Sequence, residues 1–235
     1  MNLEAFSDLA GRMWDEIPPA AREGVERVTI VAEPLRHPDF EDVYTLGECV
    51  TDSWPDGYGE GDVRSELLLY HGSFEALAAR DLSFEWAEEL WETILHELLH
   101  HREAAAGESG LDEFDWAEEQ NRLRWAGRPF DPAFHDAVPA DADGVIRLDS
   151  ELFVVCLLGG SDEEAVFDWR EKRYTVRVPK DVVAAFVQVT NLAGGRMTLV
   201  VRRRPSWWRR LVGSAAGPPV ELRRSALPAS TNEGN

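Results

Sequence analysis

One stretch of this chain, residues 84–106, constrains its fold most, because it is long and regular enough to predict a single amphipathic helix. Ser83 is a suitable N-cap and Gly107 a suitable stop. At about 100° per residue the apolar side chains collect into one stripe, which other elements have to cover. We therefore expect a helix whose back lies on the core and whose polar front lines a cleft. The stripe consists of Phe84, Ala87, Leu90, Trp91, Ile94 and Leu98.

The polar front of this helix carries the sequence His96-Glu97-Leu98-Leu99-His100. Two histidines four residues apart lie one helical turn apart on the same face, and neutral imidazole is a preferred zinc ligand. The glutamate that follows the first ligand can hold a metal-bound water and act as general base. Because both histidines point away from the apolar stripe, we interpret them as zinc ligands rather than as surface histidines, with Glu97 as the catalytic base.

The other histidines are not assigned to the metal. His101 falls at the edge of the apolar stripe, and we expect a partly buried histidine that makes one hydrogen bond. Three more are isolated in other segments and are given no chemical role; they are His37, His71 and His135.

A catalytic zinc usually has three protein ligands, and the third is expected on the next predicted helix, residues 111–125. Glu118 falls on the inward face of that helix, where a carboxylate is unfavourable unless it is paired or bound to a metal. Glu118 is therefore the first choice, and Asp115, which borders the same face one turn earlier, is the next. The alternative role for Glu118 is a salt bridge to Arg122 or Arg124, and whichever acid is not the ligand can orient a histidine. The acids that point elsewhere are expected to be solvated; they are Asp112 and Glu113.

The rest of the chain predicts an α+β protein in two parts. Residues 1–128 mix helices and strands in an α/β unit, and residues 145–204 show the period of two that predicts a small all-β unit, whose role stays unknown. Residues 129–144 are rich in Pro and Asp and are interpreted as a linker. Residues 205–235 are basic and rich in Pro, Ala and Ser, so a disordered tail is expected. In detail we expect a helix at 3–17, a loop at 57–61, and strands at 25–31, 43–50, 66–71, 151–158, 165–169, 173–178, 184–190 and 197–203.

Four segments, FSDLAGRMWDEIP, VERVTIVAEP, ELLLYHGSF and WETILHELLHH, follow one another in the first half of the chain. In this order they resemble the minimal zincins (minigluzincin-like), a bacterial family of short and mostly uncharacterised metallopeptidases, over residues 3–126. The resemblance implies a compact zincin fold with a small sheet packed on the motif helix. It also implies that His96 and His100 are zinc ligands and that Glu97 is the general base. Short members are similar to HExxHxxGxxD, whereas this chain continues as HREAAAGESGLDEFDWAEE, so the resemblance does not identify the third ligand.

Charge and hydropathy exclude several classes of function. The formal net charge of −20 disfavours nucleic-acid binding, because phosphate contacts need basic side chains. No apolar run reaches the roughly 18 residues of a membrane span, and the N-terminus lacks the pattern of a secretory signal. The isolated Cys49 and Cys156 favour a reducing compartment, and we expect a cytoplasmic protein. The basic run RRRPSWWRRLV, which contains Trp207 and Trp208, is interpreted as part of a solvated tail, with contact to a membrane surface as the alternative.

These patterns lead to the hypothesis of a zinc-dependent metallopeptidase that hydrolyses peptide or protein substrates through a metal-activated water. A strand at residues 66–71 is expected at the edge of the sheet, where it would align an extended substrate. The alternative is a non-enzymatic binding module in which the metal stabilises a zincin scaffold. The number of ligands separates the two, because three protein ligands and an open position favour catalysis and four favour a structural role.

Overall fold

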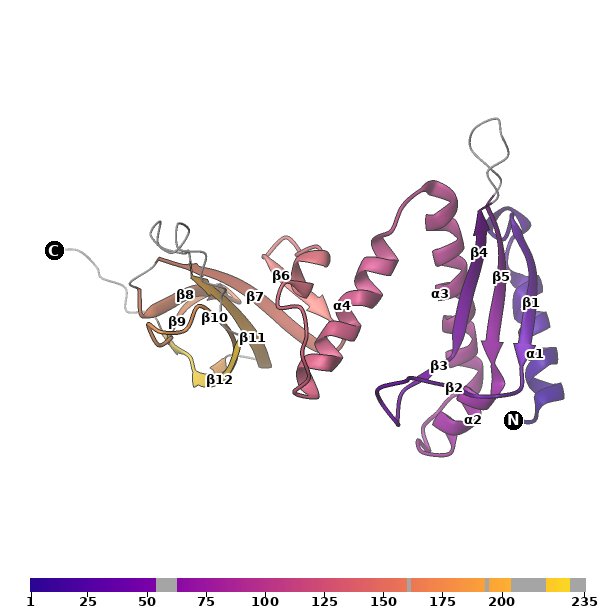
Figure 1. Cartoon of the computed structure of the whole chain (residues 1–235), viewed down its shortest axis with the longest axis horizontal. Helices are drawn as coiled ribbons and strands as arrows, with labels where there is room; N and C mark the ends of the chain where they lie inside the picture. The colour runs from indigo at the N-terminus through magenta and orange to yellow at the C-terminus, as the bar shows by residue number, and fades with distance from the viewer. Residues whose placement is uncertain (54–62, 160–161, 193–194, 204–218, 229–235) are drawn as a thin grey trace. The chain divides into compact units, whose positions relative to one another are not determined.

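A computed structural model of the chain describes residues 1–53, 63–159, 162–192, 195–203 and 219–228. The chain divides into two compact units, Met1–Asp112 and Glu113–Asn235, which are described one at a time. Helices and sheets both occur in it (Figure 1), so the predicted α+β class is confirmed. None of the described helices is both long and apolar enough to cross a membrane.

The main sheet of the first unit has three strands in the order β1-β5-β4 (Figure 1), and β2 and β3 form a separate antiparallel pair. The central strand β5 (Val63–Tyr70) is parallel to β1 (Val25–Val31) and antiparallel to β4 (Gly47–Ser53). The strand expected at the edge is therefore the centre of the sheet, because both neighbours pair with it, and β4 and β1 are the edges within the described residues. The strand also stops one residue early, since His71 starts a helix that the sequence did not predict. The other elements are α1 (Leu3–Glu16), the short 3-10 helix η1 (Pro19–Ala21), β2 (Leu35–Arg36), β3 (Tyr44–Thr45) and α2 (His71–Ala78).

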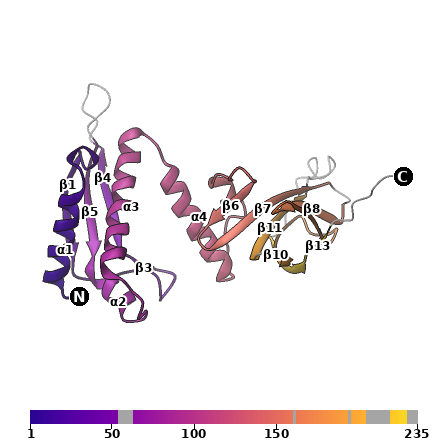
Figure 2. The ribbon, with the colours of Figure 1, turned by 180° about the vertical axis from the view of Figure 1, so that it is seen from behind.

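The apolar stripe of α3 (Trp86–Ala106) packs against this sheet and against α1. Side chains alternate along β5, so Ser65, Leu67 and Leu69 share its buried face. Figures 1 and 2 show α3 running alongside β4 and β5. Full burial of each large apolar side chain contributes about 1.5–3 kcal/mol, and this holds the back of the helix in place. The shared cluster consists of Phe6, Ala10, Ile17, Leu69, Phe74, Leu90, Ile94 and Leu98.

The predicted N-terminal cap of α3 differs from the structure, whereas the predicted C-terminal end agrees with it. The helix begins at Trp86, with Glu85 at the N-cap position and no side-chain cap. The hydroxyl of Ser83 instead donates to Asp81 in the preceding turn, so the predicted cap is wrong. At the other end Gly107 has φ 69° and ψ 28°, the left-handed conformation that glycine adopts most readily, and the predicted stop is confirmed.

The second unit consists of two sheets and the helix α4 (Gly110–Trp125), whose residues from Glu113 onward belong to it. The larger sheet has the strand order β12-β10-β11-β7-β6, and the smaller has the order β13-β9-β8. One apolar cluster fills the space between the sheets, and a second joins α4 and η2 (Phe134–Ala137) to the other face of the larger sheet. The strands are β6 (Val145–Leu148), β7 (Glu151–Leu158), β8 (Glu164–Trp169), β9 (Lys172–Arg177), β10 (Ala184–Leu192), β11 (Gly195–Arg203), β12 (Val220–Ser225) and β13 (Leu227–Pro228).

Three segments that the sequence placed outside the β unit belong to the second unit. Residues 113–128 group with it because Ala117 of α4 is fully buried in its second cluster. The expected linker, residues 129–144, contributes Phe134 to the same cluster, so it is packed rather than extended between units. The expected disordered tail contains β12, which pairs in parallel with β10. Two further expectations, the loop at 57–61 and the tail segment with Trp207 and Trp208, fall outside the described residues.

Candidate metal centre

The two motif histidines lie on the face of α3 that points away from the sheet. His96 is exposed and His100 is half-buried, whereas Leu98 between them is 4% exposed. The Nε2 atoms of the two rings are 3.2 Å apart, and the ring centroids are 4.8 Å apart with the planes at 75°. The helix therefore directs one nitrogen of each ring at the same point.

The other ring nitrogen of His100 is held by a carboxylate. Its Nδ1 lies 3.0 Å from Oδ1 of Asp112, in the first turn of α4. A carboxylate at Nδ1 favours the tautomer that carries its proton there, which leaves the lone pair of Nε2 for a metal. Asp112 was expected to be solvated, and its side chain is indeed 73% exposed, but it also orients the ring. A pairing across the turn at Gly107 leaves no periodic signal, so the sequence did not reveal it.

Asp115 of α4 lies close to the two histidines. One ligand atom each of His96, His100 and Asp115 lie within 4.8 Å of one another, and Glu118 is not in a group of this kind among the described residues. Glu118 is instead close to Asp149 and Asp115, and burial together with these two carboxylates raises its pKa to about 7. Of the two acids that the sequence offered as third ligand, the structure therefore brings the second choice to the histidines.

This donor set fits zinc. With Zn–N bonds of about 2.0–2.1 Å in a tetrahedron, two imidazole nitrogens should be about 3.3 Å apart. The observed 3.2 Å between the Nε2 atoms agrees with this value. Two imidazoles and one carboxylate also form a ligand set that zinc uses in catalytic sites.

Glu97, which lies between the two histidines in the sequence, packs against the start of β4. It is only 6% exposed. A Cβ atom added to Gly47 would lie 2.9 Å from its Oε1 and 2.8 Å from its Cγ, so only glycine fits at that position without displacing the glutamate. The carboxylate is therefore held against the first residue of an edge strand and not in open solvent.

Hydrogen bonds of His101 connect α3 to β5 and to the residue Glu23 before β1. It is 2% exposed, its Nδ1 is 2.8 Å from Oγ of Ser65, and its Nε2 is 2.7 Å from the carbonyl oxygen of Glu23. Because a carbonyl oxygen only accepts, Nε2 donates to it, and in the neutral ring Nδ1 accepts from the serine hydroxyl. The ring thus makes two hydrogen bonds where the sequence led us to expect one. The bond to Ser65 fixes the position of α3 along β5.

The remaining histidines lie in other hydrogen-bonded or buried positions. His71 is buried, and its Nε2 is 3.0 Å from the carbonyl oxygen of Met1. His37 accepts from the backbone N–H of Asp39. His135 is fully buried in the second unit. None of the three belongs to a metal-ligand group among the described residues.

Comparison with known proteins gives little on function. No known protein family matches the chain, and no curated protein does either. Among solved structures, the chain is similar to a conserved hypothetical protein from Thermo thermophilus, with 38% sequence identity. The match covers 45% of this chain and 98% of that one, with a TM-score of 0.40.

Proposed function

We propose that this chain is a zinc-dependent hydrolase of peptide bonds with a zincin-type first unit. His96, His100 and Asp115 are its metal ligands, and Glu97 is its general base. The observation that carries the proposal is the pair of Nε2 atoms 3.2 Å apart, with the opposite nitrogen of His100 held by Asp112. The acid in the ligand group supports it further.

Each residue has a separate task in this proposal. Zinc, when bound, polarises the scissile carbonyl and lowers the pKa of its water to about 7. Asp112 keeps the ring of His100 in the orientation for binding. Glu97 accepts a proton from the attacking water and passes it to the departing amine.

The position of Glu97 suggests where the substrate lies. Its carboxylate is against Gly47, the first residue of the edge strand β4. An edge strand presents unpaired backbone N–H and C=O groups, to which an extended peptide can be added. We therefore assign substrate alignment to β4 and not to the central strand that the sequence suggested.

The metal assignment is tested first, by elemental analysis of the purified protein. We expect about one zinc per chain, and we expect His96→Ala and His100→Ala to lose it because each removes one of three ligands. His37→Ala is the matched control and keeps its zinc, since His37 lies outside the ligand group and accepts from the nearby Asp39. Full zinc in both motif variants would end the metal assignment.

The catalytic assignment is tested with Glu97→Gln. This variant keeps its zinc, because the carboxylate is not a ligand, but hydrolysis of a peptide library slows by about 10²- to 10⁴-fold. Equal rates for the variant and the parent would show that Glu97 is not the base. A zinc-loaded parent that cleaves no peptide in the library would favour the non-enzymatic binding module.

A further inference from the structure

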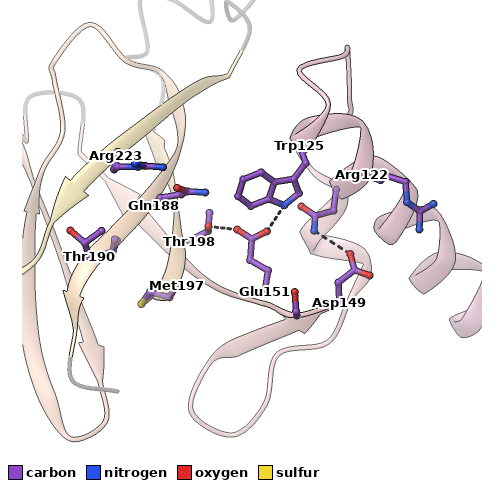
Figure 3. A pocket seen from close by; sticks show the side chains of 12 residues that line it. Arg122, Trp125, Asp149, Glu151, Gln188, Thr190, Met197, Thr198 and Arg223 are labelled. Atoms are coloured by element: carbon purple, nitrogen blue, oxygen red, sulfur yellow. Dashed lines mark hydrogen bonds between the residues drawn. The ribbon is translucent and has the colours of Figure 1, made fainter. Parts of the chain in front are cut away.

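The second unit contains a cavity that takes no part in the candidate metal centre. Its volume is about 590 Å³, within the range of small-molecule sites. It lies between the last turn of α4 and the strands β10, β11 and β12 (Figure 3). The side chains that matter for its chemistry are Trp125, Glu151, Gln188, Thr198 and Arg223.

One wall of the cavity is a row of polar side chains across three adjacent strands. Gln188 of β10 is in register with Thr198 of β11 on one side and with Arg223 of β12 on the other. Residues in register share a face of the sheet. Figure 3 shows the side chains of Gln188 and Arg223 pointing toward Trp125. Arg223 makes no ion pair with any residue that the structure describes, so its charge is open to a ligand.

The opposite wall is the indole of Trp125, which is held rigidly although it is 59% exposed. Its Nε1 donates to Oε2 of Glu151 at 3.0 Å. The guanidinium of Arg124 lies over the ring, 4.7 Å from its centroid. An aromatic ring fixed in this way is a platform on which another flat ring can stack.

The acids of the cavity are hydrogen-bonded to neighbouring side chains of the protein. Glu151 accepts from Arg124, Trp125 and Thr198, so both of its oxygens are engaged, and it shares the buried guanidinium of Arg124 with Glu221. Asp149 accepts from the side-chain amide of Asn121 at 3.3 Å. The groups left to meet a ligand are therefore the donors, the guanidinium of Arg223 and the amide of Gln188.

We infer that this cavity is a binding site for a small aromatic carboxylate. The ring of the ligand stacks on the indole of Trp125, and its carboxylate pairs with Arg223 and accepts from Gln188. The inference does not depend on the proposed peptidase activity, because no residue of the metal centre lines the cavity.

Isothermal titration of the full chain, freed of metal with a chelator, tests the inference with three probes. Phenylacetate carries both the ring and the charge, phenylacetamide keeps only the ring, and acetate keeps only the charge. We expect saturable binding of phenylacetate, and binding at least about tenfold weaker for each of the other two. Such a ratio corresponds to the loss of one charge-assisted contact or one stacking contact of about 1.4 kcal/mol.

Two arginines on β12 provide a matched pair of variants. Arg223→Gln should weaken phenylacetate binding about tenfold, because it removes the charge that faces the ligand. Arg224→Gln removes the same charge one residue further along, on the opposite face of the strand, and should leave binding unchanged. Trp125→Leu should also abolish binding in protein whose melting curve matches that of the parent.

Three results would each overturn the inference. They are absence of saturable phenylacetate binding, equal affinity for phenylacetate and phenylacetamide, and equal weakening by Arg223→Gln and Arg224→Gln. The two arginine variants lie on an exposed edge strand, so they decide the matter even where the tryptophan variant does not fold.

Discussion

At the scale of single residues, the spacing of the motif predicted that His96 and His100 share a helix face but did not show which acid lies beside them. His96 and His100 follow from helical geometry alone, because four residues span one turn. The choice between Asp115 and Glu118 depended on which acid is buried; the sequence placed Glu118 on the inward face, and in the structure both acids are half-buried. In the structure, however, the carboxyl group of Glu118 lies beside that of Asp149, which comes from a different segment of the chain. A contact of that kind leaves no trace in a helical projection.

Zinc affinity measured by competition with a chelator distinguishes the two acids. Asp115→Ala should weaken binding more than about 100-fold, beyond the 10- to 100-fold that is typical of losing an outer partner. Glu118→Ala should change the affinity by less than that, since Glu118 is not in the ligand group. Glu113→Ala, on the same helix, is the control. A larger loss of zinc affinity in the Glu118 variant would mean that Glu118 is the third ligand, which was the first choice from the sequence.

At the scale of elements, the helices and strands were easier to predict than their neighbours in the sheet. The strand at 25–31 and the C-terminal end of α3 agree with their sequence patterns. The central position of β5 did not follow, because an apolar strand of this length has a similar pattern at an edge and in the centre. Helix α2 was missed because it begins with His71, which was counted as the end of the strand, and continues with Gly72 and Ser73, which are typical of a turn.

The register of α3 on the sheet depends on His101, and this can be measured. His101→Leu leaves the carbonyl of Glu23 without its imidazole partner and removes one of the two hydrogen bonds of the Ser65 hydroxyl, which keeps its bond to Thr51. The unsatisfied carbonyl costs about 1–3 kcal/mol and the lost bond to Ser65 about 1 kcal/mol more, so we expect the free energy of unfolding to fall by about 2–4 kcal/mol in urea titrations. Ser65→Ala leaves the bond of His101 to Glu23 in place but removes the bonds of the serine to His101 and Thr51, and should cost about 1–3 kcal/mol. An unchanged urea midpoint in the leucine variant would show that the histidine does not anchor the helix.

At the scale of the whole molecule, composition revealed two parts but not where they meet. Pro and Asp suggested a linker at 129–144, yet Phe134 buries that segment in the second unit. β12 was assigned to the tail because residues 205–235 are rich in Pro, Ala and Ser. In the structure five of its six residues are exposed, so the strand has no apolar alternation that could have revealed it. It is held by backbone pairing with β10, a form of stabilisation that does not depend on side-chain pattern.

The second unit should also respond to pH through one buried group, His135, and one half-buried group, Glu118, whose pKa values shift in opposite directions. His135 is fully buried, and burial lowers its pKa to about 4 from an ordinary value of 6.5. The unfolded chain therefore binds a proton between these values that the folded chain does not, and stability is lost as the pH falls through this window.

The pKa of Glu118 is raised from 4.5 to about 7, chiefly by burial and then by Asp149 and Asp115. The folded chain then keeps a proton that the unfolded chain has released, so stability is lost as the pH rises from about 4.5 to 7.

Glu118→Gln isolates the second effect, because the amide resembles the protonated carboxyl group and cannot ionise. We expect the variant to gain stability over the parent at pH 8 and to gain less or nothing at pH 5, where the parent is already protonated. Urea unfolding of both proteins at the two pH values, in the presence of a chelator to exclude metal, measures the difference. Glu113→Gln, which removes the same charge from α4, is the control and should give the same small change at both values. A gain at pH 5 as large as that at pH 8 would mean that Glu118 carries no raised pKa, and its place beside Asp149 would then have to be reconsidered.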